Sequence, residues 1–492
     1  MHKIGIIVLL ALFLLSSRVL LLKLPPVWPD EAIYADVVMN MINEGRMGSD
    51  LWQDAIPGMR NGAVWNPPVF FYILYLWFKI VGLSIAKQRL LSVIFTVAFI
   101  AIMYRFSKLF IHHKKKWLPV ILIGIVLVDY VFSHWGFYIN RPEIIVLTFG
   151  LFSLYFFQKN LSAQKMDKSQ TYNIIASGIF ASAAALTHFI GVLFYVSILI
   201  SWIVAKGFSA FKNKNLYIFS VVFIIPIFLW FITSILPNMN LFLQQISMAV
   251  SRKQGDPSSL LYSLIYEISE PQIILYGQLL LGLLMTFFVL KQKKTKYVLV
   301  AVTLIISWFF AYNGKMEAYW LYPISFTYLG TTILLADDKF RHKFFTVLVY
   351  GVIVFTNFSI RWRDFIPYQN QSFYSYDIFS EKILETVPDN TAVFISSIPD
   401  PYFAFKKYNR KNILYMSPAF NIKKEDYLKI LHDTDYIIYT SDYSSIVHGD
   451  FLRRYIEQNV ESEYAIGSYK QYEAQIFKLK DRNLRAKPVS NE

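Results

Sequence analysis

The sequence predicts a mostly α-helical polytopic membrane protein with a small α/β domain at its C-terminal end. First, 55% of the 492 residues are hydrophobic and only 16% are charged, and a soluble chain of this length would carry more charge. Second, apolar runs of about 16–22 residues recur between short Lys-rich connectors, a length that crosses a bilayer as helix. Third, short strand-like runs alternate with helix-like runs after about residue 361.

The charge distribution favours a lipid bilayer over nucleic acid as the partner. The formal net charge is +15, but Lys and Arg concentrate in the connectors between apolar runs. This is the positive-inside pattern of membrane proteins. The chain contains no cysteine, which excludes a disulfide framework and thiolate chemistry.

The N-terminal segment predicts a retained first span. A short basic start precedes an apolar run from Ile4 to Leu22, and no small-residue cleavage site follows it. Further spans are predicted at about 88–110, 117–135, 142–158, 172–188, 190–206, 215–235, 272–290, 297–312, 317–336 and 343–360.

Segment 66–84, NPPVFFYILYLWFKIVGLS, decides the topology. It is apolar, but it is short, opens with two prolines and is interrupted by Lys79. If it does not cross and the N-terminus is cytoplasmic, the basic connectors 112–116, 159–168, 206–215, 291–296 and 337–343 all face the cytoplasm. If it crosses, all of them face outward. The positive-inside rule therefore favours an interfacial or re-entrant helix, about eleven spans, and an extracytoplasmic C-terminus.

This topology predicts a catalytic transmembrane domain over 1–360 and an extracytoplasmic α/β domain over 361–492. The external surface comprises the first loop (about 23–87), the turns at 140–143, 188 and 313–318, and loop 236–271. In the C-terminal domain we expect parallel strands at 392–396, 412–417 and 435–441, helices at 401–410, 423–433 and 448–460, and a closing hairpin over 464–480. It contains no glycine-rich nucleotide-binding motif.

Two adjacent carboxylates, Asp30 and Glu31, follow the first span in WPDEAIYADVVM. One interpretation is structural, because Pro29 suits the first position of a helix and acids in the first turn complement its dipole. The other is chemical, because a carboxylate pair beside a bilayer is costly without a partner.

The acidic pair belongs to an ordered series of motifs. It is followed by NPPVFFYILYLWFKIVG (66–82), Arg89 at the start of the next span, RPEIIVLTF (141–149), LTHFIGVLF (186–194) and AYWLYPISF (318–326). In this series the chain resembles the GT-C glycosyltransferases, and within them the protein O-mannosyltransferase and aminoarabinose (lipid A) transferase group (glycosyltransferase family 39-like, dolichyl-phosphate-mannose transferase-like). The resemblance covers roughly 1–360. The chain departs from the group at Asn66, where Lys or His is usual, at Glu143 in place of Asp, and at Ala318 before Tyr319.

The resemblance implies a membrane enzyme that transfers a monosaccharide, with inversion, from a polyprenyl-phosphate donor to an extracytoplasmic protein, lipid or envelope glycan. The acceptor hydroxyl needs a general base, and we predict Asp30. Glu31 points about 100° round the same helix and would orient the acceptor, a cation or the loop. The leaving phosphate requires positive charge or hydrogen-bond donors, for which the candidates are Arg89, Arg141, Lys79, Tyr319 and Lys315. Further site candidates are Glu143, His188 and Asn66.

Several of these candidates also have a structural interpretation. Lys79 and Arg89 would extend to the headgroups, Glu143 would be a surface partner of Arg141, and His188 would be a turn residue. No ligand spacing assigns a metal, and whether a divalent cation takes part stays open. Two other functions remain. One is a transporter or lipid flippase, against which this sequence shows no pair of broken helices at matching positions. The other is a non-catalytic scaffold for envelope assembly.

Overall fold

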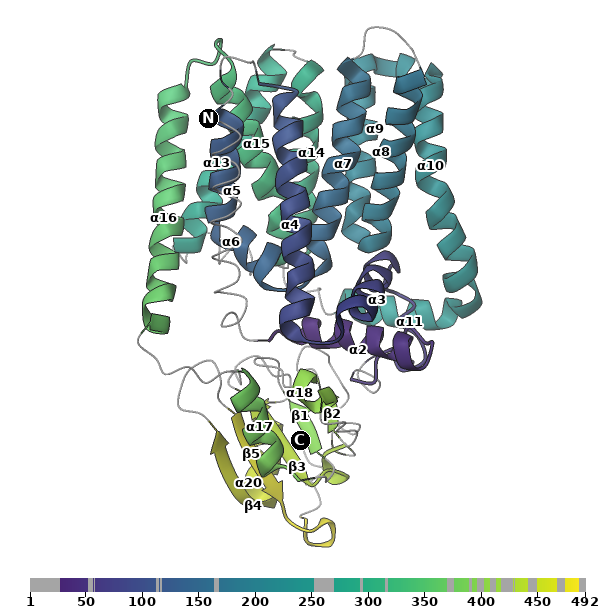
Figure 1. The fold of residues 1–492 in the computed structure, drawn as a ribbon, viewed down its shortest axis with the longest axis vertical. Helices are drawn as coiled ribbons and strands as arrows, with labels where there is room; N and C mark the ends of the chain where they lie inside the picture. The colour runs from purple at the N-terminus through teal and green to yellow at the C-terminus, as the bar shows by residue number, and fades with distance from the viewer. Residues whose placement is uncertain are drawn as a thin grey trace.

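In the computed structural model, long helices form a bundle and a small α/β unit lies beyond one end of it (Figure 1). The structure describes residues 27–51, 56, 58–111, 115, 117–162, 168–251, 270–292, 295–314, 317–369, 376–388, 392–395, 402–407, 413–416, 428, 430–440, 449–466 and 474–485.

Every span predicted after the first coincides with a helix of the bundle. These helices are α4 (Ile85–Lys108), α5 (Leu118–Val128), α7 (Pro142–Ser162), α8 (Lys168–Thr187), α9 (Val192–Lys206), α10 (Lys214–Trp230), α13 (Glu270–Gln292), α14 (Thr295–Gly314), α15 (Leu321–Ala336) and α16 (Lys343–Gln369). The predicted first span, 4–22, lies outside the described residues.

By length and composition, four stretches of the described residues can cross a membrane: Ile85–Lys108, Pro142–Leu161, Phe189–Lys212 and Lys214–Met248. A bent helix pair over 118–138 is a fifth candidate, and shorter apolar helices occupy 69–81, 277–289, 297–312 and 343–357. The chain is therefore a mostly helical membrane protein. Its sidedness stays a prediction.

Burial distinguishes the centre of the bundle from its lipid-facing edge. In α15 every residue from Leu321 to Leu334 is buried, as expected for a helix surrounded by other helices. In α10, by contrast, Ile224, Phe228 and Leu229 are exposed. Large apolar side chains on the outside of a bundle are suited to contact with lipid.

The predicted span 117–135 is not straight. α5 ends at Val128, and α6 (Tyr130–Ser133) continues into the π-helix η2 (His134–Tyr138) at an angle of 72°. Asp129 stabilises the bend: its Oδ1 accepts a hydrogen bond from the Phe132 amide (3.0 Å), and its Oδ2 accepts one from the Tyr328 hydroxyl (2.6 Å). The bend carries the following residues, 139–141, toward the end of the bundle that faces the α/β unit.

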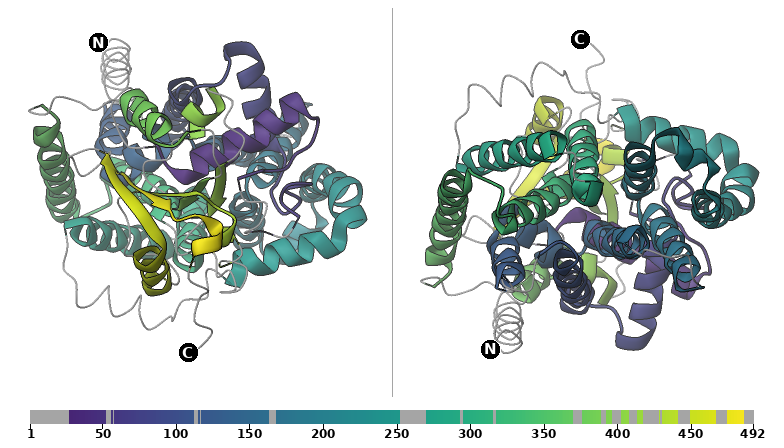
Figure 2. Two further views of the ribbon diagram at one scale, coloured as in Figure 1. Left: turned by 90° about the horizontal axis from the view of Figure 1, so that it is seen from below. Right: turned by 90° about the horizontal axis from the view of Figure 1, so that it is seen from above.

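That end of the bundle, termed the site end, is covered by three helices: α2 (Pro29–Asn43), α3 (Val69–Val81) and α11 (Met239–Ser251). α2 lies crosswise to the long helices and packs against α3 (Figures 1 and 2). α3 has 13 residues, about 20 Å at 1.5 Å per residue, which is shorter than a hydrocarbon core of about 30 Å. Its length and its place at the site end support the interfacial interpretation of segment 66–84.

The C-terminal α/β unit, residues 376–485 as far as described, contains the sheet that the strand pattern predicts. Its strands are β1 (Ala392–Ile395), β2 (Ile413–Met416), β3 (Tyr436–Thr440), β4 (Val460–Ile466) and β5 (Ala474–Leu479), in the order β2-β1-β3-β5-β4. β1 pairs in parallel with β2 and β3, whereas β5 pairs antiparallel with β3 and β4. The parallel core and the closing hairpin were both predicted.

Helices flank this sheet. They are α17 (Tyr376–Thr386), α18 (Tyr402–Lys407) and α20 (Gly449–Asn459), of which α17 and α20 contact β5. α16 continues as one helix to Gln369. The proposed domain boundary at residue 360 therefore falls within α16, and the α/β unit begins with α17.

Candidate active site

The first turn of α2 forms the centre of the candidate site. Pro29 occupies the first helical position and Asp30 and Glu31 follow it. The Trp28 amide donates a hydrogen bond to Glu31 Oε2 (3.1 Å), satisfying a backbone donor next to the helix start. Helix-start geometry, one of the two interpretations of the acidic pair, is thus present and directs Glu31 into the protein.

Glu31 is fully buried against Arg89 of α4. Arg89 Nη2 lies 2.7 Å from Glu31 Oε2 and Arg89 Nε lies 2.9 Å from Glu31 Oε1. The amide of Asn140 donates a further hydrogen bond to Oε1 (2.9 Å). A buried charge is tolerated when it is paired and hydrogen-bonded, and Glu31 meets both conditions. The contact joins α2 to α4 and to the turn before α7.

Asp30 pairs with Arg141, which is shared with a second carboxylate. Arg141 Nη1 donates to Asp30 Oδ2, and Arg141 Nη2 donates to Glu143 Oε1 (2.9 Å). The guanidinium also stacks over the Trp135 ring, 5.4 Å from its centroid. Arg141 and Glu143 are buried, whereas the Asp30 side chain is 22% exposed. Asp30 is therefore the carboxylate in this group that a ligand can reach.

His188 and Tyr319 meet at the same end of the bundle. His188 Nδ1 accepts a hydrogen bond from the Ile190 amide (3.2 Å), so the neutral ring carries its proton on Nε2. That nitrogen lies 3.5 Å from the Tyr319 hydroxyl. The turn is tight: a Cβ on Gly191 would lie 2.2 Å from the carbonyl carbon of Ala184. Glycine at 191 is thus what permits this turn geometry.

Tyr34 is a site residue that the sequence analysis missed as such. It follows Asp30 by four residues, so the two share a face of α2. Its ring packs edge-on against Phe70 of α3, with centroids 4.9 Å apart, and its hydroxyl interacts electrostatically with Asp30 and Arg141. Burial, reinforced by the charge of Asp30, raises the pKa of Tyr34 well above its usual value. Tyr34 therefore remains a neutral hydroxyl in the site. The four-residue spacing from Asp30 is the signal that could have identified it.

The structure brings together most of the predicted site residues. The acid–arginine cluster comprises Asp30, Glu31, Arg89, Arg141 and Glu143, and His188 interacts electrostatically with Glu143. The interpretation of Arg89 as a side chain that extends to the headgroups is wrong, because Arg89 is buried against Glu31. Glu143 is indeed the partner of Arg141, but it is buried instead of lying at the surface.

Other candidates lie apart from this cluster. Lys79 is exposed near the end of α3, where its ammonium lies 4.7 Å from the centroid of Tyr75. Asn66 is half-buried in the turn before α3. Lys315 lies outside the described residues. Within the described residues, no group of three or more His, Asp or Glu side chains has the arrangement of a metal site.

Comparison with known proteins agrees with this fold. Residues 65–232 match the family model described as dolichyl-phosphate-mannose-protein mannosyltransferase. The structure is similar to that of ArnT from Cupriavidus metallidurans in the apo state, with a TM-score of 0.61, 12% sequence identity and coverage of 97% of this chain and 98% of that chain. No curated protein matches the chain by sequence.

Two further structures extend the comparison. ArnT from the same organism bound to undecaprenyl phosphate aligns with a TM-score of 0.57 at 12% identity, covering 96% of this chain and 98% of that chain. The oligosaccharyltransferase of Archaeoglobus fulgidus, tethered to an acceptor peptide, also aligns with a TM-score of 0.57 at 12% identity, covering 94% and 72%.

These findings define the fold class. The chain has the GT-C fold of known membrane glycosyltransferases, as the motifs predicted. Within that class the mannosyltransferase family model matches the stretch that contains Arg89, Arg141, Glu143 and His188, in agreement with the resemblance predicted from the motifs.

Proposed function

We propose that the chain transfers a monosaccharide from a polyprenyl-phosphate-linked donor to an extracytoplasmic acceptor, a protein, lipid or envelope glycan, with inversion at the anomeric carbon. ArnT, which has a similar structure, was solved bound to undecaprenyl phosphate. The archaeal oligosaccharyltransferase AglB from Archaeoglobus fulgidus, also similar in structure, was solved with an inhibitory peptide and a dolichol-phosphate. Both complexes support a lipid phosphate as the carrier of the sugar that is transferred.

The observation that carries the proposal is the partial exposure of Asp30 within an otherwise buried cluster. Activating an acceptor hydroxyl requires a base within hydrogen-bond reach of it. Glu31 and Glu143 are enclosed, but one side of Asp30 faces solvent while Arg141 holds the other. Asp30 is therefore the general base of the proposed reaction, and Arg141 orients it.

The departing phosphate needs stabilisation on the face opposite the acceptor. The hydrogen-bond donors near Asp30 are the Arg141 guanidinium and the hydroxyl groups of Tyr34 and Tyr319. His188 Nε2–H lies beside Tyr319. Preorganised donors of this kind stabilise developing negative charge without reorganisation. Because the phosphate leaves as a stable anion, the proposed reaction needs no general acid.

In the proposed reaction Glu31 and Arg89 act indirectly. Their buried pair fixes the first turn of α2 against α4 and the Asn140 amide. This holds the backbone of Asp30, the adjacent residue, in a constant place. Arg89 was predicted as a phosphate ligand; its contact with Glu31 favours a positioning role instead.

Asp30→Asn tests the base assignment. Membranes that contain the protein, together with the acceptors of the cell envelope, are incubated with a panel of polyprenyl-phosphate sugars that includes dolichyl-phosphate mannose, and release of the lipid phosphate is followed. We expect the wild-type chain to consume at least one donor and Asp30→Asn to be about 10²–10⁴-fold slower. Asp338→Asn, which removes an exposed carboxylate beside Lys115, is the matched control. Wild-type transfer by Asp30→Asn would show that another group is the base.

A further inference from the structure

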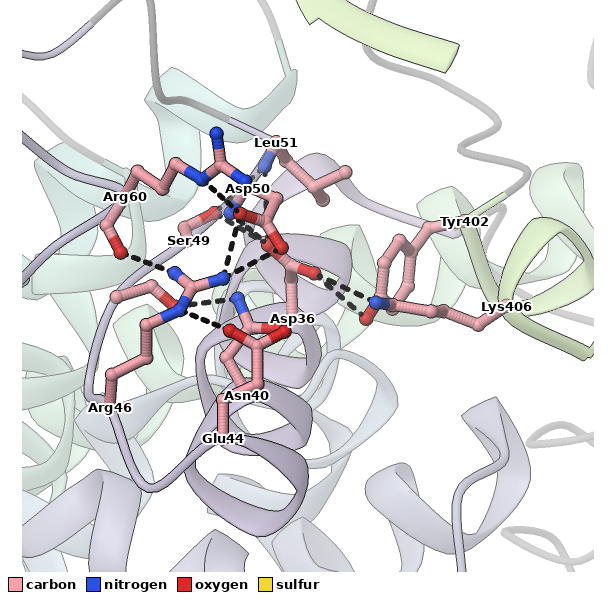
Figure 3. Close-up of polar contacts among 11 residues, drawn as sticks. Asp36, Asn40, Glu44, Arg46, Ser49, Asp50, Leu51, Arg60, Tyr402 and Lys406 are labelled. Atoms are coloured by element: carbon pink, nitrogen blue, oxygen red, sulfur yellow. Dashed lines mark hydrogen bonds and ion pairs between the residues drawn. The ribbon is translucent and has the colours of Figure 1, made fainter. Parts of the chain in front are cut away.

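Asp36, in the middle of α2, is a buried carboxylate outside the acid–arginine cluster. Its Oδ2 accepts hydrogen bonds from the Ser49 hydroxyl (2.8 Å), the Asp50 amide (2.7 Å) and the Leu51 amide (3.2 Å) (Figure 3). These donors belong to the loop that follows α2. One oxygen of Asp36 thus fastens this loop back onto its own helix.

The other oxygen faces the C-terminal α/β unit. The Tyr402 hydroxyl donates to Asp36 Oδ1 (3.2 Å), and Lys406 Nζ lies 3.6 Å from the same atom (Figure 3). Tyr402 and Lys406 both belong to α18, and Tyr402 is buried. Residues 366 positions apart in the sequence therefore meet at a single carboxylate.

A second layer of contacts holds the loop in place around Asp36. Arg46 Nη2 lies 2.8 Å from Asp50 Oδ1, and Arg60 Nε lies 3.5 Å from the same oxygen. Asn40 Nδ2 donates to the carbonyl of Gly48 (3.0 Å), and a Cβ on Gly48 would lie 2.2 Å from the Arg60 carbonyl oxygen. These contacts hold the loop where its hydrogen-bond donors meet Asp36.

Glu31 and Asp36 anchor α2 on two different sides. They are five residues apart, which places them about 140° apart around the helix at 100° per residue. Glu31 contacts the bundle through Arg89, whereas Asp36 contacts α18 through Tyr402 and Lys406. Together with the packing of α2 on α3, these two contacts restrain the orientation of the helix from both sides. Asp30 is carried by this same helix.

Stability alone does not account for a carboxylate at position 36. Burial raises the pKa of Asp36 even though Lys406 and the hydrogen bonds from Ser49 and Leu51 lower it. The charged form is thus less favourable here than in water. A neutral side chain would relieve this cost, but it would not attract Lys406.

We propose that Asp36, Tyr402 and Lys406 are positioning residues, through which the C-terminal α/β unit sets the orientation of α2 and so the place of Asp30. The inference rests on the proposed function for the role given to Asp30. It makes the α/β unit a structural part of the catalytic centre, so that the unit acts on the transfer step itself.

The first test compares Tyr402→Phe and Lys406→Met with Lys478→Met. The control removes an ion pair within the same unit, that between Lys478 and Glu461 (3.0 Å), and does not touch α2. With the donor that the wild-type chain consumes, we expect kcat to fall about 5- to 100-fold in the two α18 variants, since small misplacements of a reacting group have large effects. KM for the donor should stay within about twofold, because these residues do not contact the donor, whereas a binding role would raise KM.

Rescue provides the second readout. Asp36→Asn combined with Lys406→Gln restores a neutral hydrogen-bonding pair, and we expect its kcat to exceed that of either single variant. A role limited to the folding of the α/β unit predicts no such recovery. Equal kcat in the double variant and the weaker single variant would therefore count against the positioning role.

Hydrogen exchange of the α2 amides (29–43) tests the contact without any donor. We expect faster exchange in Tyr402→Phe and Lys406→Met than in Lys478→Met, because α2 loses one of its anchors. Unchanged exchange together with unchanged kcat overturns the inference, and so does faster exchange with wild-type kcat. If the wild-type chain consumes no donor of the panel, the proposed function fails, and exchange alone then decides whether α18 orders α2.

Discussion

Arg89 and Glu31 form a buried bidentate ion pair that links the first turn of α2 to α4, with nitrogen–oxygen distances of 2.7 and 2.9 Å. Removing either side chain takes its opposite charge away from the other, which stays buried. We expect Glu31→Gln and Arg89→Met each to destabilise the protein by about 3–5 kcal/mol. Thermal unfolding in micelles measures the loss, with Lys115→Met, at a partly exposed pair with Asp338, as the control. A loss of stability as small as that of the control would mean that Arg89 and Glu31 do not form this ion pair in the folded protein.

Tyr319 and His188 are expected to serve the leaving phosphate. Tyr319→Phe removes one hydroxyl, which lies 3.5 Å from His188 Nε2. We expect transfer to slow by about 10- to 100-fold, with the unfolding temperature measured alongside. Tyr217→Phe, which removes an exposed hydroxyl bonded to the Phe211 carbonyl, should leave both quantities unchanged. A Tyr319→Phe variant with full activity would remove Tyr319 from the proposed site.

Gly191 is expected to be essential for the turn that presents His188. In Gly191→Ala the new Cβ would lie 2.2 Å from backbone atoms of Ala184, so the turn must shift. We expect at least about a tenfold loss of transfer, because a displacement near 1 Å has effects of this size or larger. Gly351→Ala in α16, where nothing lies within 4 Å of the added carbon, is the matched control and should retain activity. Equal activities in the two variants would indicate that the position of His188 is unimportant.

The topology prediction can be tested with reporter fusions. A reporter inserted at 84–87 should be extracytoplasmic and one inserted at 112–116 cytoplasmic, because the positive-inside rule places the basic connectors inside. Paired reporters, one active on each side of the membrane, give opposite readings at the two positions. Detection of 112–116 outside would reverse the proposed orientation of the whole bundle, including the site end.

Asp36 has a predictable effect on the pH dependence of stability. Its pKa is raised in the folded protein, so folding favours the protonated form. This contribution is complete below the ordinary Asp value of about 3.9 and is lost as the pH rises through the raised value. Relative to Asp36→Asn, the wild-type protein should thus lose stability as the pH increases. Unfolding temperatures of both proteins from about pH 4.5 to pH 8 test this. An unfolding temperature of the wild-type protein that rises relative to that of the variant as the pH increases would contradict the prediction.

The local features of this fold could be predicted from the sequence. Apolar run length located the helices of the bundle, and the strand pattern located β1, β2 and β3, since both signals are properties of short segments. The order of the motifs indicated the class and brought Asp30 and Arg141 forward as site residues. The bend at Asp129 was missed, because its cause is a hydrogen bond from Tyr328, about 200 residues away in the chain and invisible to a local pattern.

The partners of the charged residues were harder to predict. Arg89 has the sequence context of a side chain that extends to the headgroups, and only the crosswise placement of α2 brings Glu31 to it. Asp36 has the context of a solvent-facing acid on an amphipathic helix. Its contacts with Tyr402 and Lys406 depend on where the α/β unit lies against the bundle, which hydropathy and propensity do not specify.

The two anchors of α2 also bear on how the protein is made. A chain emerging from the ribosome forms its early segments first, so α2, α4 and the turn before α7 are all synthesised long before α18. Until α18 has folded, Asp36 lacks Tyr402 and Lys406, and one side of α2 is unsupported. A nascent chain already inserted in the membrane would therefore hold an incomplete catalytic centre, and activity would begin only once α18 has been synthesised and has packed against α2.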